Sequence, residues 1–204
     1  MKIAIIDYGV GNIANVYNAW RRIGVSAVVT RDAAVIRSAD MIELPGVGAV
    51  RDALANLRRY ELIPLLQEEV GKGKFFVGVC LGMQLLFEKE YEGGEAEGLG
   101  FLPGSVVPFR IALKVPHMGW NELSFRRPHW LQEKLPPRPY VYFVHSYYKT
   151  PVDSDDVIAV AAYEHDVPAV CGRDNILGMQ FHPEKSGSVG EQILRNIAAY
   201  ARKG

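Results

Sequence analysis

The stretch Phe75-Phe76-Val77-Gly78-Val79-Cys80-Leu81-Gly82 decides the fold predicted for this chain. Its first five residues are apolar or glycine, which is typical of a buried strand in a parallel sheet. A cysteine follows at once, and the apolar spacing from Leu81 to Phe87 predicts a helix directly after it. A strand that turns sharply into a helix at a nucleophilic side chain is a nucleophile elbow, here with cysteine in place of serine.

The chemistry expected of Cys80 follows from that position. Gly78 and Gly82 flank it, and a turn this tight leaves no room for side chains beside the nucleophile. Free N–H groups at a helix N-terminus favour the thiolate, and the N–H of Leu81 would point at a tetrahedral oxyanion. The alternative is a buried structural cysteine beside packing glycines, because short motifs also occur by chance.

The segments around the elbow alternate between strands and helices. Apolar runs predict strands at Lys2–Ile6, Ser26–Thr30 and Asp40–Leu44, and helical stripes cover Asn12–Ile23, Val50–Leu57 and Leu62–Val70. Such alternation with near-continuous apolar strands predicts an α/β fold, a mostly parallel sheet flanked by helices.

The second half of the chain is predicted to be richer in β structure. Residues Glu90 to Gly104 are rich in Gly and Glu and are expected to form a loop. Short strands are predicted at Val106–Phe109, Tyr140–Phe143, Val157–Tyr163, Ala169–Cys171 and Ile176–Phe181. The last helix is expected at Val189–Arg202, where Ser188 and Glu191 form a capping-box pattern. No linker or repeat interrupts residues 1–204, so we expect a single domain.

A base for the cysteine is predicted at Phe181-His182-Pro183-Glu184, directly after the strand Ile176–Phe181. In an extended chain, residues i and i+2 face the same side, so Glu184 can accept from one nitrogen of His182 while the other faces the thiol. Alone, this sequence is more typical of a surface loop. Beside an elbow at the carboxyl edge of a sheet, it favours a Cys-His-Glu triad.

The loop Pro45-Gly46-Val47-Gly48 follows another predicted strand and can complete an oxyanion hole with Val47 and Gly48. The alternative is a plain strand-to-helix turn. Its two glycines allow a peptide plane to flip without a Cβ penalty. We therefore hypothesise that the free chain holds the wrong backbone orientation here and that a partner turns a donor toward the oxyanion.

Composition excludes several other classes of function. Lys plus Arg and Asp plus Glu both number 23, so nothing favours nucleic acid or an anionic membrane as a partner. The two cysteines are too few for a disulfide scaffold, and no apolar run reaches bilayer length, which together favour the cytoplasm. The histidines lack metal-ligand spacing, and Asp7–Asn12 lacks the third glycine of a dinucleotide loop, so we expect neither metal nor cofactor.

Taken together, these motifs resemble the triad-type glutamine amidotransferases, and most closely the glutaminase subunits of imidazole glycerol phosphate synthases. The resembling segments occur in the family's order and span nearly the whole chain: Asp7–Asn12, Leu44–Ala49, Gly78–Gln84, Val115–Asn121, Phe143–Tyr148 and Gln180–Ser186. No catalytic position departs from the family's pattern. Glu90–Gly98 and Phe125–Pro139 match nothing in it.

The resemblance implies roles for individual residues. Cys80 would attack the side-chain amide of glutamine, His182 would protonate the departing ammonia and then activate water, and Glu184 would hold His182. Oxyanion donors would come from Leu81 and the Val47–Gly48 strand. Glutamine would be held by Gln84 and by the segment His145, Ser146 and Tyr147.

The resemblance also implies a partner. In the family, the ammonia passes to a cyclase subunit with a TIM-type barrel, in a heterodimer of histidine biosynthesis, and glutaminase activity depends on the cyclase together with its ligand. Trp120 matches an interface position, although it could also be an ordinary buried tryptophan.

Three rival functions stay open at this stage. The chain could be a triad glutaminase that serves another synthase, such as the anthranilate type. It could be a non-catalytic binding module, which would predict a damaged triad. It could also be a cysteine peptidase or a redox-sensing protein, which would leave the late His-Pro-Glu placement unexplained.

Overall fold

The computed structural model describes residues 1–202, and its centre is a sheet of eight strands in the order β2-β1-β3-β4-β14-β13-β12-β9. The first five run parallel: β2 (Ser26–Thr30), β1 (Lys2–Ile6), β3 (Met41–Leu44), β4 (Phe75–Val79) and β14 (Ile176–Met179). The rest continue antiparallel: β13 (His165–Arg173), β12 (Val157–Tyr163) and β9 (Ser124–Phe125). This confirms the predicted α/β fold with a mostly parallel sheet.

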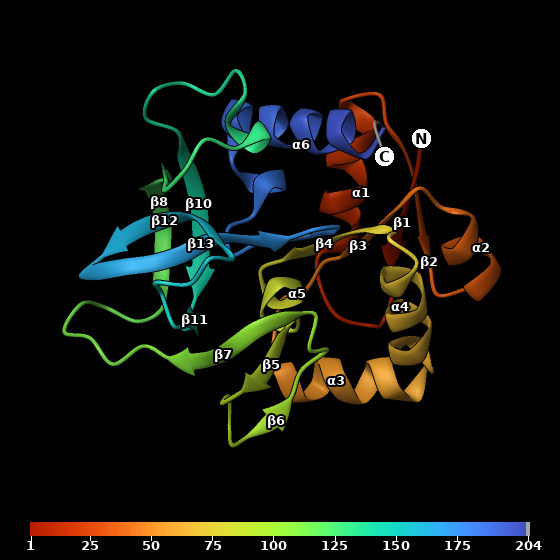
Figure 1. Cartoon of the computed structure of the whole chain (residues 1–204), viewed down its shortest axis with the longest axis horizontal. Coiled ribbons are helices and arrows are strands. Elements are labelled where there is room, and N and C mark those ends of the chain that lie inside the picture. The colour runs from red at the N-terminus through yellow and green to blue at the C-terminus, as the bar shows by residue number, and fades with distance from the viewer. Residues whose placement is uncertain (203–204) are drawn as a thin grey trace.

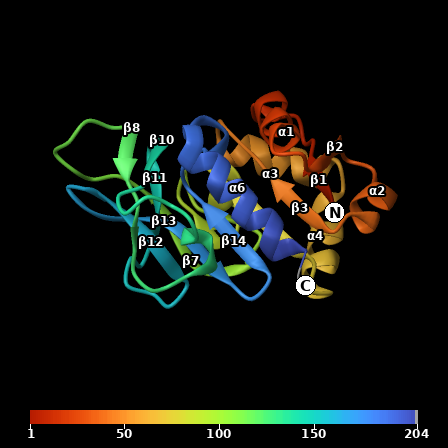
Figure 2. The same ribbon diagram turned by 90° about the horizontal axis from the view of Figure 1, so that it is seen from above.

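Helices cover both faces of this sheet, each over its own apolar cluster. On one face lie α1 (Ile13–Arg22) and α6 (Gly187–Ala201), and on the other lie α3 (Val50–Arg59) and α4 (Leu62–Gly71) (Figures 1 and 2). The short helices α2 (Ala33–Ser38) and α5 (Leu81–Gln84) pack with the second group. Burial on both faces explains why the parallel strands are apolar almost throughout. None of the helices within residues 1–202 is long and apolar enough to cross a membrane.

Two smaller sheets flank the large one: the first lies beside β12 and β13, and the second extends from there to the region of α5 and α3 (Figure 1). In one, β8 (His117–Glu122) pairs antiparallel with β10 (Tyr140–His145). The other has the order β11-β7-β5-β6, with β11 (Tyr147–Thr150), β7 (Leu102–Pro108), β5 (Phe87–Glu90) and β6 (Ala96–Glu97). Single 3-10 turns, η1 (Trp130–Gln132) and η2 (Pro183–Lys185), complete the described elements.

The order of the large sheet brings three sequence motifs together. β3, β4 and β14 are neighbours, and the Pro45–Gly48 loop, Cys80 and His182 follow their respective carboxyl ends. Since parallel strands end at the same edge, the three segments converge there, where ligands bind in open α/β sheets.

Two expectations about the stretch after the elbow are wrong. The helix α5 ends at Gln84, and the residues up to Phe87 lead into β5; β6 and the start of β7 lie within the predicted Glu90–Gly104 loop. The run from Leu85 to Phe87 is fully buried, and an apolar run of this length does not distinguish helix from strand. Gly98 marks a close strand approach, since a Cβ there would lie 2.1 Å from the Phe87 carbonyl oxygen.

The predicted capping box at Ser188 and Glu191 is also wrong. α6 begins at Gly187, so Ser188 lies inside the helix, and Glu191 pairs with Arg195 instead. The residue before the helix, Ser186, uses its hydroxyl elsewhere: it donates to the His182 carbonyl at 2.6 Å and accepts from the Tyr142 N–H at 3.0 Å. Ser186 thus ties the start of α6 to the strand β10.

Glu90 predicts a pH dependence of stability. The side chain is buried on β5, and neither carboxyl oxygen has a hydrogen-bond partner among the described residues. Burial, and secondarily the charge of Glu92, raises the pKa of Glu90 from 4.5 to about 9. A raised pKa contributes stability that is complete below 4.5 and is lost as the pH rises through about 9. Over that window we expect the free energy of unfolding to fall by a few kcal/mol, on the order of one for each unit of pKa shift.

Urea unfolding at a series of pH values measures this slope. Glu90→Gln cannot titrate and should flatten the decline, whereas Glu97→Gln removes an exposed carboxylate of the neighbouring strand and should leave the decline unchanged. A Glu90→Gln slope equal to that of the wild type would contradict the assignment of a neutral buried carboxyl.

Candidate active site

The elbow holds Cys80 in a conformation that few non-glycine residues adopt. Its φ is 54° and its ψ −109°, so the backbone reverses between β4 and α5. Glycine is required on both sides: a Cβ at Gly82 would lie 1.8 Å from the Leu44 carbonyl oxygen, and one at Gly78 would lie 2.5 Å from the Gly82 oxygen. Strain of this kind persists where the surrounding packing imposes it, as at nucleophile elbows.

His182 and Glu184 form the predicted contact, but in a different backbone conformation. His182 Nδ1 lies 2.8 Å from Glu184 Oε1, and both side chains are buried. Only His182 is extended, because Pro183–Lys185 is a 3-10 turn. Since a carboxylate only accepts, the Nδ1 atom carries the proton, and Nε2 is the atom left to act on a thiol.

The electrostatics of His182 favour the imidazolium. Burial alone lowers its pKa, but the interactions with Cys80 and then Glu184 outweigh burial and raise the pKa to about 9. Nε2 nevertheless has no aligned hydrogen-bond partner among residues 1–202. We therefore attribute the effect of Cys80 to electrostatic proximity rather than to a formed Nε2–thiol hydrogen bond. A nitrogen that lacks a partner in the free chain is free to move a proton once substrate is bound.

A cavity of about 290 Å³ opens at Cys80. All the other residues predicted to bind glutamine or the oxyanion line it together with Cys80: Val47, Gly48, Leu81, Gln84, His145, Ser146 and Tyr147. His182 and Glu184 are not among the lining residues. The cavity brings together residues from five separate stretches of the sequence.

Glu92 was missed by the sequence analysis and also lines this cavity. It provides the one carboxylate of the lining residues and accepts from the Val50 N–H at 2.7 Å, which fixes the loop beside α3. Five glutamates occur between Glu88 and Glu97, so the sequence alone has no signal that selects it.

Gln180 is a second functional candidate that sequence reasoning did not single out. It is fully buried two residues before His182, and its Nε2 lies 3.8 Å from the sulfur of Cys80. An N–H donor favours a thiolate over a thiol. The signal was present, because a glutamine that ends an apolar strand must find a polar partner when buried.

The predicted oxyanion hole is not assembled. The Leu81 N–H donates to the Gly46 carbonyl oxygen at 3.4 Å. In a trans peptide the C=O and N–H point in opposite directions, so the Val47 N–H of that same peptide points away from Leu81. Tyr8 also holds the segment, because its hydroxyl donates to the Pro45 carbonyl at 2.7 Å.

Trp120 lies outside the cavity, on the outward face of β8. Its side chain is 57% exposed and that of Met118 is 56% exposed, so the alternative of an ordinary buried tryptophan is wrong. Tyr142 on β10 lies opposite Trp120 in the antiparallel register, with ring centroids 6.2 Å apart. An apolar face thus stands beside η2, the turn that carries Glu184.

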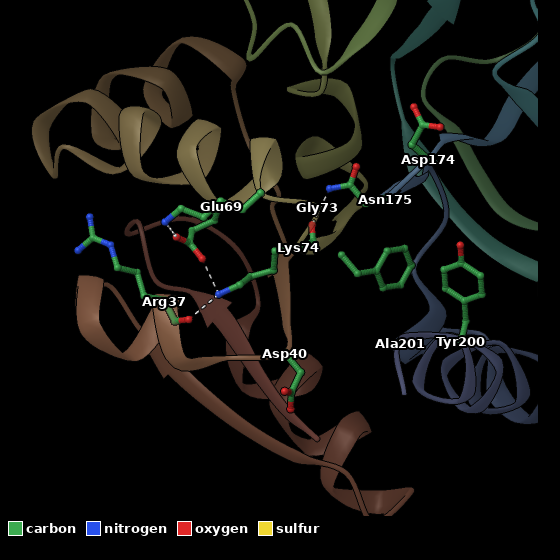
Figure 3. Close-up of a pocket in the computed structure, with 11 residues that line it drawn as sticks. Arg37, Asp40, Glu69, Gly73, Lys74, Asp174, Asn175, Tyr200 and Ala201 are labelled. Atoms are coloured by element: carbon green, nitrogen blue, oxygen red, sulfur yellow. Dashed lines mark hydrogen bonds and ion pairs between the residues drawn. The ribbon is translucent and has the colours of Figure 1, made fainter. Parts of the chain in front are cut away.

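A larger cavity of about 740 Å³ lies at the opposite, amino-terminal edge of the sheet (Figure 3). Its charged groups are largely paired with one another: Glu69 binds both Lys72 and Lys74, and Lys74 also donates to the carbonyls of Ile36 and Arg37. No group of three potential metal ligands is found there or elsewhere in the described part of the chain. Size alone therefore does not make this cavity the active site.

Comparison with known families fits this geometry. Residues 4–200 match the family Glutamine amidotransferase class-I. The chain belongs to the class-I glutamine amidotransferase family. In this amidotransferase the cysteine elbow and the His182–Glu184 pair lie at the carboxyl edge of the sheet.

Similarity to individual proteins indicates a branch within the family. The chain is 48% identical over 202 residues to imidazole glycerol phosphate synthase subunit HisH of Salinibacter ruber, which covers 96% of this chain and 93% of the relative. It is 42% identical to the HisH subunit of Aquifex aeolicus over 204 residues, 100% and 99% of the two chains. These HisH proteins match this amidotransferase over nearly the whole length of both chains.

Solved structures share the fold at much lower identity. A glutamine amidotransferase crystal structure aligns with a TM-score of 0.77 at 19% identity over 98% of each chain. A chain of the PurLQS structure from Thermotoga maritima aligns with a TM-score of 0.77 at 17% identity, again over 98% of each chain. At such identities the likeness concerns the fold alone.

The His182–Glu184 contact predicts a titration. Because Glu184 contributes to raising the pKa of His182 to about 9, Glu184→Gln should lower that pKa, with imidazolium lost at lower pH than in the wild type. Nitrogen NMR of labelled histidine in the free chain measures it. Glu191→Gln, which removes a surface carboxylate of α6, should leave the titration unchanged. An unchanged His182 titration in Glu184→Gln would show that the carboxylate does not hold the ring.

Proposed function

We propose that Cys80, His182 and Glu184 form the triad with which this glutamine amidotransferase hydrolyses glutamine to glutamate and ammonia. One observation carries the assignment: the 2.8 Å contact between His182 and Glu184 lies at the same sheet edge as a strained cysteine elbow. As its HisH relatives are subunits of imidazole glycerol phosphate synthase, we assign the chain the same place, in histidine biosynthesis. The second rival, a non-catalytic module, would not need a complete triad.

The mechanism follows from the positions of the groups. The Cys80 thiolate attacks the side-chain amide carbon of glutamine, and the oxyanion of the tetrahedral intermediate forms beside Leu81. His182, as imidazolium, gives its Nε2 proton to the nitrogen that leaves as ammonia. The neutral ring then takes a proton from water, which attacks the thioester and releases glutamate and the thiolate. Glu184 keeps the ring in one orientation through both steps.

Recognition of glutamine is assigned to the walls of the cavity. The substrate carries an ammonium and a carboxylate besides the reacting amide. We assign Glu92 to the ammonium, because it is the one carboxylate of the lining residues. Gln84 and the backbone of Ser146 and Tyr147 face the same space and offer neutral donors and acceptors.

The oxyanion hole suggests how the activity is controlled. In the free chain the Gly46 carbonyl takes the Leu81 N–H that the oxyanion needs. We propose that partner binding flips the Gly46–Val47 peptide, which would free the Leu81 donor and turn the Val47 N–H inward. Such a flip changes ψ of residue 46 and φ of residue 47, and Gly46 has no Cβ to restrict its part of the rotation.

The partner is proposed to be a cyclase subunit with a TIM-type barrel, bound as a heterodimer. Support comes from an apolar face of β8 and β10, on which Met118 and Trp120 are exposed and the half-buried Tyr142 lies opposite Trp120. Aromatic and methionine side chains that are exposed side by side are typical of interaction surfaces. Lys185, from the turn that holds Glu184, lies over the Tyr142 ring at 5.9 Å, so a barrel docked here would also reach the triad.

We further propose that residues 1–204 act as one domain and that the chain works in the cytoplasm. The triad, the cavity and both apolar clusters are built on one shared sheet, which supports a single unit. A reactive thiol at Cys80 persists best in a reducing compartment.

Glutamate release from glutamine tests the function directly. It is measured for the chain alone, with a cyclase barrel partner, and with that partner plus its nucleotide ligand. Activity should appear with partner and ligand and vanish in Cys80→Ala. Cys171→Ala is the matched control: that thiol is buried in the core, so the variant loses some stability but should keep its activity.

Every other outcome of this assay would contradict one part of the proposed function. Strong activity of the free chain would retain the triad but remove the proposed control by a partner. Activity that survives Cys80→Ala would overturn the assigned nucleophile. Absence of activity in every condition would favour the non-catalytic module, and rapid peroxide oxidation of Cys80 in its place would favour the redox sensor.

The proposed peptide flip predicts that two reactions of Cys80 respond differently to the partner. Iodoacetamide alkylates a thiolate without an oxyanion, whereas glutamine hydrolysis needs one. One oxyanion donor is worth about a hundred- to a thousand-fold in kcat. Because the flip supplies two donors, from Leu81 and Val47, we expect the liganded partner to accelerate hydrolysis by at least about that factor and to leave the alkylation rate of Cys80 nearly unchanged. Equal acceleration of both reactions would instead mean that the partner opens access to the thiol.

A further inference from the structure

A chain of hydrogen bonds leads from the strand β8 to the glutamine cavity, and its end groups determine which atom donates at each step. It starts at Asn121, whose Oδ1 accepts from the Glu122 N–H at 2.8 Å and whose Nδ2 donates to the Ala162 carbonyl at 2.8 Å. Because a carbonyl oxygen only accepts, the atom that faces Ala162 must be the NH₂ group. The orientation of this amide is therefore fixed by its neighbours.

The amide of Asn121 sets the tautomer of His117. The second Nδ2 hydrogen faces His117 Nε2 at 3.2 Å, so that nitrogen must be unprotonated. The proton of a neutral His117 then lies on Nδ1, which is 3.0 Å from His145 Nε2 and donates to it. His145 must in turn carry its proton on Nδ1, which donates to the Tyr147 carbonyl at 2.8 Å. The Ala162 and Tyr147 carbonyls at the two ends of the chain can only accept, so both require the same assignment of donors and acceptors along it.

The surroundings keep both histidines neutral and in place. His117 is stacked between Phe143 and Tyr163, with ring centroids at 4.6 and 4.0 Å. Burial lowers the pKa of His117 to about 4, and burial likewise lowers the pKa of His145 to about 3. Neither ring is therefore a proton donor for catalysis at neutral pH. Each has one N–H and one lone pair, and both are used.

The far end of the chain reaches the catalytic thiol. The Tyr147 carbonyl accepts a second hydrogen bond, from Gln84 Nε2 at 3.2 Å. Gln84 Nε2 also donates to Gln180 Oε1 at 3.1 Å, and Gln180 Nε2 faces the Cys80 sulfur at 3.8 Å. The Tyr147 carbonyl is thus the point where the histidine chain and the glutamine pair meet.

We propose that His117 and Asn121 are positioning residues that fix the tautomer and orientation of His145, and so hold the Tyr147 carbonyl and Gln84 in the shape that binds glutamine. Neither His117 nor Asn121 lines the cavity, so they act through His145, which does. The inference rests on the proposed glutaminase function and names residues to which the triad mechanism gives no role.

Two substitutions of His117 separate positioning from packing. The amide nitrogen of asparagine can occupy the place of the imidazole Nδ1, so His117→Asn keeps the donor to His145 but loses the stacked ring. His117→Phe keeps a ring between Phe143 and Tyr163 but leaves His145 Nε2 without a donor. An unmet buried hydrogen bond costs about 1–3 kcal/mol, which corresponds to roughly a 5- to 150-fold change in binding.

We expect the liganded complex of His117→Phe to show a KM for glutamine raised roughly tenfold or more by the unmet hydrogen bond, with kcat within about a factor of two. His117→Asn should keep a KM near that of the wild type although its thermal stability falls further. His129→Phe, at a histidine that caps η1 away from the cavity, is the matched control and should leave KM unchanged. A KM that is raised more in His117→Asn than in His117→Phe would mean that KM follows stability, and this would overturn the proposal. An unchanged KM in both variants would overturn it as well.

A second measurement does not depend on activity. Nitrogen NMR of the free wild-type chain reports histidine tautomers, and both His117 and His145 should be neutral with the proton on Nδ1. A proton on Nε2 of either ring, or an imidazolium at neutral pH, would overturn the derived direction. If the wild-type complex released no glutamate, the proposed glutaminase function would fail, but the positioning role could still be tested. Calorimetry in a Cys80→Ala background would then measure the affinity of the His117 variants for glutamine and decide that role.

Discussion

The close approach of the elbow to the neighbouring strand is the constraint on which the rest of the site depends. The Cα of Gly82 packs so tightly against the Leu44 carbonyl that no side chain fits between α5 and β3. This contact fixes where α5 begins, and so the left-handed backbone of Cys80 and the direction of its thiol. It also brings Gly46, two residues after Leu44, within reach of the Leu81 N–H. Nucleophile and oxyanion loop are therefore set by one packing contact.

The order of the strands in the large sheet is the second determinant of the site. β4 lies between β3 and β14, so the segments that follow these strands meet although about a hundred residues separate Cys80 from His182. Ser186 then ties η2 to β10, which carries His145 at its end. The triad, the glutamine cavity and the apolar face of β8 and β10 are consequently parts of one mechanically continuous region. A partner bound to that face touches elements that also carry catalytic groups.

Buried polar groups in this region divide into two kinds. Those around the cavity are joined in a directional network that ends at Tyr147 and Cys80, and each donor in it has an acceptor. Others have oxygen or nitrogen atoms without partners among residues 1–202: both carboxyl oxygens of Glu90, Nε2 of His182 and Oε2 of Glu184. The first kind fixes shape, because every partner constrains the next. Atoms of the second kind can still exchange protons, and at His182 this is the property on which the proposed catalytic role depends.

The sequence by itself determined the elements whose cause is local. The apolar run Phe75–Val79, the two glycines around Cys80 and the His-Pro-Glu segment predicted the parallel sheet, the elbow and the residues proposed as nucleophile and base, since each follows from periodicity or from the steric needs of a turn. Tertiary structure alone decided the rest. Glu92 could not be chosen among its neighbouring glutamates, because only its place beside the start of α3 and the cavity distinguishes it. Gly98 was taken for a loop residue, because only its close approach to β5 gives it a role. The occupied Leu81 N–H and the histidine tautomers likewise depend on groups distant in sequence, which no local pattern contains.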